Sequence, residues 1–251
     1  MVQPAPLASV HNPTVKFLRS LAQKKHRQEA GLFVAEGADM LARAKALGWV
    51  PEMILSVAAF EGWAGVKTTP VSDKVMAALS AQSNPPGVLA TFAQRWTEDV
   101  TPGGTWIALE NIRDPGNLGT IMRTADAGGA AGIILVEDCV DPFAPECVRA
   151  STGSIFAVPL ARLSLAAMVD LMQAWPGEKV ATSMAGDSDF RRAYRGPALL
   201  CMGSESAGLS RVLSEACGVK VRIPMKPGVE SLNVATATAL MLYEINRGAL
   251  A

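Results

Sequence analysis

The most constraining feature of the sequence is a change of hydrophobic period within its C-terminal stretch, Ala198–Glu244. Two short apolar runs, Ala198–Met202 and Val219–Ile223, have the length and the flanking residues of strands. From Ser231 onward the apolar residues recur at helical spacing, with Ser231 as the expected N-cap. Each expected strand leads into a loop that contains Gly or Pro. This pattern predicts an α/β sheet, in which ligands bind at the carboxyl ends of the strands.

The rest of the chain alternates strand and helix patterns in the same way. Residues 1–93 contain short elements separated by breaker clusters, which predicts a small α/β domain. Residues 94–104 show no period and end in Thr-Pro-Gly-Gly, as expected for a linker. Residues 105–251 are expected to form a mostly parallel sheet with helices on both faces, because the run Gly132–Val136 is apolar throughout. A further short strand is expected at Ala157–Leu160.

The composition argues against several classes of site. Lys and Arg number 23, as do Asp and Glu, so the net charge is zero and a polyanion would need a local basic patch. The only histidines are His11 and His26, and no C-x-x-C pair occurs, which argues against zinc and against a Ser-His-Asp triad. The cysteines are expected to be buried free thiols. Without a signal-peptide pattern or a membrane-length apolar run, we expect a cytoplasmic protein with no membrane or metal partner.

A basic amphipathic segment lies near the N-terminus, after Asn12. Two interpretations are open: a solvated helix face followed by a basic loop, or a surface that contacts RNA phosphates, with Phe17 and His26 nearby. The candidate RNA-binding residues are Lys16, Arg19, Lys24, Lys25 and Arg27.

Polar residues gather in the loop that follows the expected strand Trp106–Glu110. Asn117 in this loop is either an ordinary turn residue and helix N-cap, or part of a site. In the helix that follows, the stripe formed by Leu118, Ile121, Met122 and Ala125 is expected to face the core. That arrangement places Arg123 on the opposite side, where a guanidinium could bind a phosphate or a ribose.

The loop after Met202 reads Gly-Ser-Glu-Ser-Ala-Gly-Leu. Gly203 would allow close approach of the backbone to a ligand. Glu205 is either a functional carboxylate or a first-turn residue of a helix. Neither the G-x-G-x-x-G fingerprint nor the phosphate-binding G-x-x-x-x-G-K-[ST] motif occurs, which removes the main support for a dinucleotide or nucleoside triphosphate site.

Three segments together resemble one family. N-I-R-D-P-G-N-L-G-T-I-M-R-T-A-D-A, A-L-L-C-M-G-S-E-S-A-G-L and I-P-M-K-P-G-V-E-S-L-N-V resemble, in order and separation, the three signatures of the SpoU (TrmH-like) RNA ribose 2′-O-methyltransferases of the SPOUT superfamily. The resemblance covers about Ile107–Glu244. The first ninety residues resemble, less closely, the substrate-binding domain that many members carry.

The resemblance implies a deep trefoil knot in the C-terminal part of the sheet, S-adenosylmethionine as methyl donor, RNA as substrate and a homodimer. Ribosomal RNA is favoured over transfer RNA. By position, the implied cofactor-binding residues are Met202, Gly203, Ile223, Met225 and Leu232. The implied catalytic residues are Asn117, Arg123, Glu205, Ser231 and Asn233.

The role of Arg123 has two versions. In the family it is the proposed activator of the 2′-hydroxyl, but a guanidinium normally stays charged, so a clamp on the adjacent phosphate is the alternative. The third motif departs from the family pattern at Pro227 and at Ala235. Proline removes a backbone N–H, which puts one loop contact in doubt.

Two other functions compete with methyl transfer. An RNA-binding factor without turnover would not need the complete set of site residues. An oxidoreductase with a nucleotide cofactor would be expected to carry the missing dinucleotide fingerprint.

Overall fold

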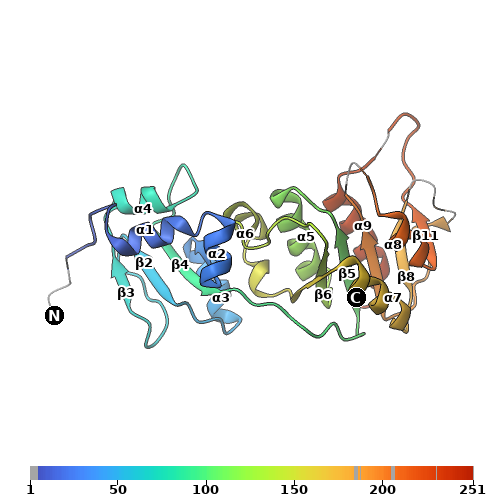
Figure 1. Ribbon diagram of the computed structural model, residues 1–251, viewed down its shortest axis with the longest axis horizontal. Coiled ribbons are helices and arrows are strands. Elements are labelled where there is room, and N and C mark those ends of the chain that lie inside the picture. The colour runs from blue at the N-terminus through green and yellow to red at the C-terminus, as the bar shows by residue number, and fades with distance from the viewer. Residues whose placement is uncertain (1–4, 184–185, 187, 205–206, 230, 251) are drawn as a thin grey trace. The chain divides into compact units, whose positions relative to one another are not determined.

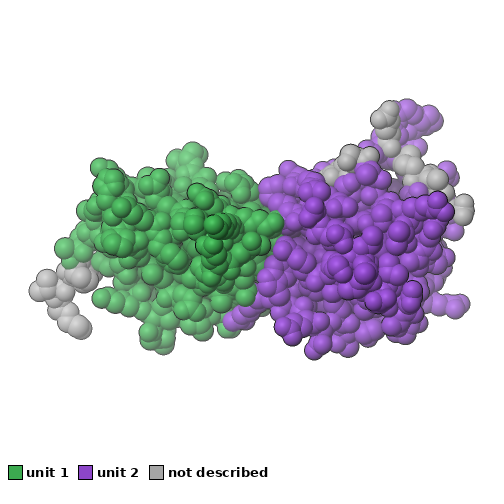
Figure 2. Space-filling model, in the orientation of Figure 1, with its two compact units in different colours: residues 1–94, 141–157 green, residues 95–140, 158–251 purple. Residues whose placement is uncertain are grey.

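The computed structural model describes residues 5–183, 186, 188–204, 207–229 and 231–250. The chain divides into two compact units (Figure 2). Unit 1 comprises residues 1–94 and 141–157, and unit 2 comprises residues 95–140 and 158–251. The first unit is therefore built from two separate parts of the chain. The predicted division at 94–104 does not account for the segment 141–157, and residues 95–104 fall within unit 2.

Unit 1 is a mixed sheet covered by helices, in the order β1-β4-β2-β3 (Figure 1). β4 runs antiparallel to β1 and β2, whereas β2 and β3 are parallel. Its strands are β1 (Leu32–Glu36), β2 (Met53–Ser56), β3 (Thr68–Pro70) and β4 (Val88–Ala93). Its helices are α1 (Pro13–Ser20), α2 (Lys24–Ala30), α3 (Ala38–Ala46), α4 (Asp73–Leu79), α6 (Pro145–Ser151) and the short 3-10 helix Ser154–Phe156.

Aromatic rings hold the segment 141–157 in unit 1. The ring of Phe143 lies 5.1 Å from that of Phe33, and Phe156 lies 4.9 Å from Phe92, measured between centroids. The indole Nε1 of Trp49 donates a hydrogen bond to the carbonyl oxygen of Phe156 at 2.8 Å. Because Phe156 is held in this cluster, the strand expected at Ala157–Leu160 begins only at its last residue and is observed as β7 (Leu160–Leu163).

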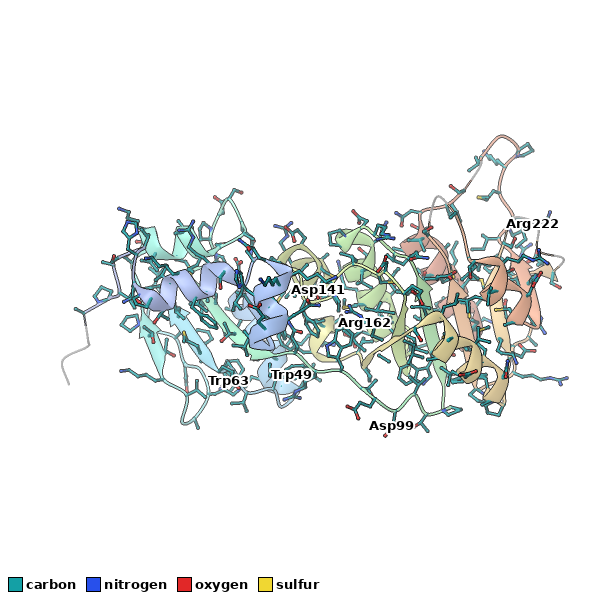
Figure 3. All side chains as sticks on the ribbon, viewed as in Figure 1. Trp49, Trp63, Asp99, Asp141, Arg162 and Arg222 are labelled. Atoms are coloured by element: carbon teal, nitrogen blue, oxygen red, sulfur yellow. The ribbon has the colours of Figure 1, made fainter. Side chains whose placement is uncertain are left out.

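Arg27 is a second anchor of this segment, and it corrects a prediction. Its side chain is only 3% exposed and binds Asp141, labelled in Figure 3, with Nη2 and Oδ2 2.7 Å apart. Its Nη1 donates to the carbonyl oxygens of Leu21 and Ala22. A guanidinium that is buried and bound to these partners does not face solvent, so it is not placed to contact an RNA phosphate. The expected basic loop is in fact helix α2, and Arg27 forms its buried side.

In the described part of unit 2, one parallel sheet has the order β7-β6-β5-β10-β8-β11-β9 (Figure 1). This confirms the predicted parallel sheet. The remaining strands are β5 (Thr105–Glu110), β6 (Gly132–Val136), β8 (Lys179–Thr182), β9 (Ser188–Asp189), β10 (Ala198–Met202) and β11 (Val219–Arg222). The helices are α5 (Pro115–Ala127), α7 (Leu165–Ala174), α8 (Arg211–Ala216) and α9 (Val234–Asn246).

Helices cover both faces of this sheet, as expected. Trp106 and Ala108 of β5 point to the face where Met168 of α7 and Leu213 of α8 are buried. Since side chains alternate along a strand, the intervening residues point to the other face, where α5 and α9 pack against each other and against the central strands. The predicted stripe of α5, which includes Leu118, is fully buried. None of the helices in the described residues has the length and apolar character needed to cross a membrane.

Candidate functional site

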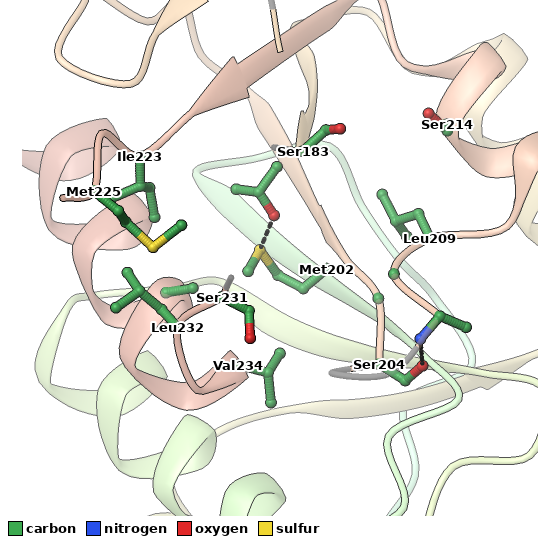
Figure 4. A pocket seen from close by; sticks show the side chains of 15 residues that line it. Ser183, Met202, Ser204, Leu209, Ser214, Ile223, Met225, Ser231, Leu232 and Val234 are labelled. Atoms are coloured by element: carbon green, nitrogen blue, oxygen red, sulfur yellow. Dashed lines mark hydrogen bonds between the residues drawn. The ribbon is translucent and has the colours of Figure 1, made fainter. Parts of the chain in front are cut away.

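A cavity of about 360 Å³ lies at the carboxyl ends of β8, β10 and β11, beside the first turn of α9 (Figure 4). This is the edge of the sheet where the strand pattern predicted a ligand. Its lining is made of small and apolar residues: Thr182, Ser183, Met202, Gly203, Ser204, Ala207, Gly208, Leu209, Ser214, Ile223, Met225, Ser231, Leu232, Val234 and Ala237. A volume of this size is within the range of small-molecule sites.

The cavity brings together the residues expected to bind the cofactor. Met202 is the last residue of β10, and Gly203 follows it. Ile223 and Met225 lie in the loop after β11, and Leu232 precedes α9. The expected catalytic residue Ser231 also lines the cavity. Thr182 Oγ1 lies 3.3 Å from Met202 Sδ, which ties β8 to β10 at this point (Figure 4).

The turn after β10 needs a glycine at position 203, whether or not a ligand is bound. A Cβ at this position would lie 1.9 Å from the carbonyl carbon of Gly208 and 2.1 Å from the amide nitrogen of Leu209. The turn is closed by a hydrogen bond from Gly208 N–H to the Ser204 carbonyl oxygen at 2.8 Å. The predicted site residue Glu205 lies outside the described residues.

The N-caps of two helices differ from the predicted ones. Asp114, not Asn117, caps α5, because its side chain accepts from the Asn117 N–H at 2.6 Å. Asn233, not Ser231, caps α9, because its side chain accepts from the backbone N–H groups of residues 235 and 236. Both differences free the displaced side chain from a capping role.

One hydrogen bond connects the first and third sequence motifs. Asn233 Nδ2 donates to Asn117 Oδ1 at 2.9 Å, joining the first turn of α5 to the N-terminus of α9. The two amides therefore hold the rim of the cavity to the helix that carries Arg123. Neither amide lines the cavity itself among the described residues.

Arg123 lies on the outer side of α5, as its position opposite the apolar stripe predicted. The side chain is exposed, and it forms no hydrogen bond or ion pair with any described residue. A guanidinium in this state keeps all its donors for a ligand.

The described lining of the cavity is electrically neutral, since it contains no titratable side chain. Cys201, next to Met202 in β10, is buried, and the pKa of its thiol is raised by a hydrogen bond with Cys217 and by burial. The cysteines are free and buried, as expected. Polar recognition in the cavity therefore falls to backbone groups and hydroxyls.

Several cavity residues were not identified from the sequence. They are Thr182, Ser183, Leu209 and Ser214. Thr182 and Ser183 could have been found from the sequence, because they are hydroxyl residues at the carboxyl end of a predicted parallel strand, where ligands bind. Glu110, outside the cavity lining, was also not singled out from the sequence; it is a buried carboxylate at the end of β5 that accepts a hydrogen bond from Ser210 N–H at 2.6 Å.

The expected RNA-binding residues, apart from Arg27, are exposed on the first two helices of unit 1. Lys16 and Arg19 lie on α1, and Lys24 and Lys25 lie on α2. Lys25 has a weak pairing with Glu29, at 3.9 Å with both side chains largely exposed. This group is called the cationic surface below.

Family models match most of the chain. The model described as the SpoU rRNA Methylase family matches residues 104–243, and one described as an MRM3-like substrate binding domain matches residues 12–90. Each match falls mainly within one compact unit.

Individual proteins match over nearly the whole chain. A 23S rRNA (uridine(2479)-2′-O)-methyltransferase of Streptomyces viridochromogenes is 32% identical, over 90% of this chain and 86% of its own length. A 23S rRNA (guanosine(2553)-2′-O)-methyltransferase of Bacillus subtilis is 27% identical, over 95% and 98%. The crystal structure of an AdoMet-bound rRNA methyltransferase from Sinorhizobium meliloti has a TM-score of 0.90 and 40% identity, and covers 98% of this chain and 99% of that one.

Proposed function

Because the chain belongs to the SpoU rRNA Methylase family, we propose that it transfers a methyl group from S-adenosylmethionine to a ribose 2′-hydroxyl of structured RNA. The observation that carries this proposal is the cavity at the carboxyl ends of β8, β10 and β11, where the second and third motifs meet. Ribosomal RNA is the favoured substrate, since both named relatives act on 23S rRNA. They act on different nucleotides, so membership indicates the reaction and leaves the target nucleotide to experiment.

The cavity fits the proposed cofactor. Its apolar side chains, Ile223, Met225 and Leu232 among them, can cover a flat ring, while hydroxyls and backbone groups can bind polar edges. The compact turn at Gly203 presents backbone directly to the cavity, because no side chain intervenes. When bound, S-adenosylmethionine supplies an electrophilic methyl group. Met202, Gly203, Ile223, Met225 and Leu232 would hold it.

The ribose hydroxyl must lose its proton as the new bond forms, so negative charge develops on its oxygen. Arg123 can stabilise that charge or bind the adjacent phosphate, because its guanidinium is exposed and has no partner among the described residues. Asn117 and Asn233 position the two helices through their mutual hydrogen bond. Ser231 lines the cavity, and Glu205 is proposed to orient the loop that contains it.

Several larger-scale features are also proposed. Residues 1–93 would be the substrate-binding domain, completed by the segment 141–157 that packs in unit 1, and the remainder of 105–251 would be the methyltransferase domain, joined at 94–104. The methyltransferase domain would contain a deep trefoil knot and form a homodimer. The surface that first meets RNA would be formed by Lys16, Arg19, Lys24 and Lys25, which are exposed and adjacent in sequence. Location in the cytoplasm is supported by the free thiols.

Two measurements test the proposal. Calorimetry should show binding of S-adenosylmethionine and no binding of NAD. Mass-spectrometric mapping of ribose methylation should reveal one methyl group that disappears from total RNA when the gene is deleted and returns with the wild-type protein. Unchanged methylation together with no cofactor heat would sink the proposal.

Gly203→Val provides a structural check on the cavity. The added side chain meets the backbone of Gly208, so the turn must open and cofactor binding should be lost. Gly218→Val is a matched control, because a Cβ at Gly218 meets nothing within 4 Å. Equal cofactor affinity in the two variants would contradict the proposed cradle.

A further inference from the structure

Helix α1 presents two different faces. Val15 and Leu18 are buried in a core with Val75 of α4 and Leu89 of β4. The side between them faces outward and carries Phe17, which is 41% exposed. The ring of Phe17 is therefore outside the buried core that holds α1.

The other aromatic residues of unit 1 show what a structural ring looks like in this protein. Four of them pack ring against ring, with centroids 4.9–6.3 Å apart: Phe33, Trp49, Phe92 and Phe156. Phe17 has no ring contact and no cation–π contact with a described residue. A single exposed apolar side chain needs no explanation by itself, so its surroundings decide.

Those surroundings are strongly cationic. Lys16 and Arg19 flank Phe17 on α1, and Lys24 and Lys25 follow at the start of α2. From residue 12 to residue 28 the sequence contains no acidic residue. The carboxylate of Glu29 is the first along the chain, and it is shared between Lys25 and His26. The chain on either side of the ring therefore carries only positive charge up to Glu29, which favours a polyanion as ligand of these two helices.

Hydrogen bonds fix the backbone beneath the cationic surface. Arg27 Nη1 donates to the carbonyl oxygens of Leu21 and Ala22, at 2.8 Å and 2.7 Å, and so fixes the turn between α1 and α2. Ser20 Oγ donates to the Phe17 carbonyl oxygen at 2.6 Å. The backbone that carries the ring and the cations is therefore preorganised, which lowers the entropy cost of ordering it when a ligand binds.

We propose that Phe17 stacks on an unpaired base of the RNA, while the cations beside it contact the backbone of the same strand. This inference rests on the proposed function, which makes RNA the substrate. Bases inside an A-form duplex are not open to stacking by a side chain, whereas bases in loops, bulges and single strands are. The inferred ligand class is therefore a loop or single-stranded segment.

The test compares two synthetic RNAs of equal length and charge: a hairpin with an unpaired purine loop and a fully paired duplex. Wild-type protein should prefer the hairpin. Phe17→Ala should weaken hairpin binding by about 5- to 150-fold, the usual effect of losing one stacked base, and should leave duplex binding unchanged. The salt dependence should keep its slope, because no charge is removed.

Two further variants separate stacking from simple apolar contact. Phe17→Tyr keeps an aromatic face and should bind like wild type, whereas Phe17→Leu keeps apolar volume and should bind like Phe17→Ala. Val50→Ala is the control, since Val50 is 59% exposed in the same unit and its near neighbours in the sequence carry no positive charge. It should bind both RNAs like wild type.

The outcomes are distinguishable. If Phe17→Leu binds as tightly as Phe17→Tyr, or if Phe17→Ala binds like wild type, the stacking inference is overturned while RNA methylation stands. If weakening extends equally to the duplex, the ring does not select unpaired bases and the inference also fails. Wild-type protein that neither binds nor methylates RNA would overturn the proposed function itself.

Discussion

The two ligand surfaces proposed for this protein rest on opposite physical principles. The cavity of unit 2 is concave, and its described lining carries no titratable group. The cationic surface of unit 1 is exposed and consists of Lys and Arg side chains. Shape and backbone contacts should dominate in the first, and electrostatics in the second. A small cofactor and a polyanion can thus be recognised by one chain whose net charge is zero.

The cores of the two units differ in a parallel way. Unit 2 buries mainly aliphatic strands between helices, and local patterns in the sequence predicted several of these elements. Unit 1 depends on rings and on a buried ion pair contributed by the distant segment 141–157. The comparison teaches that the unit with fewer parallel strands relies more on specific long-range contacts, and should be the easier one to unfold by a single change.

The largest expected effect is on the stability of unit 1. Arg27→Ala leaves Asp141 buried without its partner and removes the bonds to two carbonyl oxygens, which should cost about 3–5 kcal/mol. Chemical denaturation followed by tryptophan fluorescence measures this loss.

The exposed Arg19→Ala is the control and should change stability little. Cofactor affinity, a property of unit 2, should survive in Arg27→Ala. A variant of Arg27 as stable as wild type would show that the ion pair is dispensable, and the contrast between the two cores would fail.

The next largest effect is on the rate of methyl transfer, with no change in the stability of the fold. Arg123→Ala removes an exposed side chain opposite the buried stripe, so the fold and the cofactor affinity should remain. If Arg123 acts only in the transition state, kcat and kcat/KM should fall together by on the order of 10²- to 10³-fold. If it only binds the neighbouring phosphate, KM should rise with kcat little changed.

Arg123→Lys refines the result. It keeps the charge and loses the planar fork, so a point contact would survive and a bidentate role would not. A methylation rate equal to wild type in Arg123→Ala would remove the residue from the catalytic set.

A smaller effect tests the connection between the motifs. Asn233→Ala loses the cap of α9 and the bond to Asn117, and should cost about 0.5–2 kcal/mol in unfolding free energy. Ser231→Ala is the matched control, because Ser231 does not cap the helix in the structure. If thermal denaturation shows Ser231→Ala to be less stable than Asn233→Ala, Ser231 is the cap of α9, as the sequence predicted.

The smallest effect is on the salt dependence of RNA binding. Replacing Lys24 and Lys25 by Ala should flatten the plot of log affinity against log salt by roughly 0.7–0.9 for each lost phosphate contact. Cofactor affinity should show no such change, because the described lining of the cavity is neutral. RNA binding with an unaltered slope would show that these lysines form only a solvated helix face.

Local patterns in the sequence determined much of unit 2. The strand Ala198–Met202 was predicted with the observed bounds, and the buried stripe of α5 followed from its period. The same patterns placed Met202, Gly203, Ile223 and the residues around them at one edge of the sheet. Such features depend on neighbours a few residues apart, so the spacing of apolar residues is sufficient to predict them.

Only the tertiary structure decided the features that depend on distant residues. Arg27 is buried in a contact with Asp141, which is 114 residues away in the sequence. Asn233 forms a hydrogen bond with Asn117, which is 116 residues away. The inclusion of 141–157 in unit 1 likewise rests on rings brought together by folding. A side chain's local pattern says whether it is charged or polar. Its partner, and hence its burial and role, is set by which parts of the chain pack together.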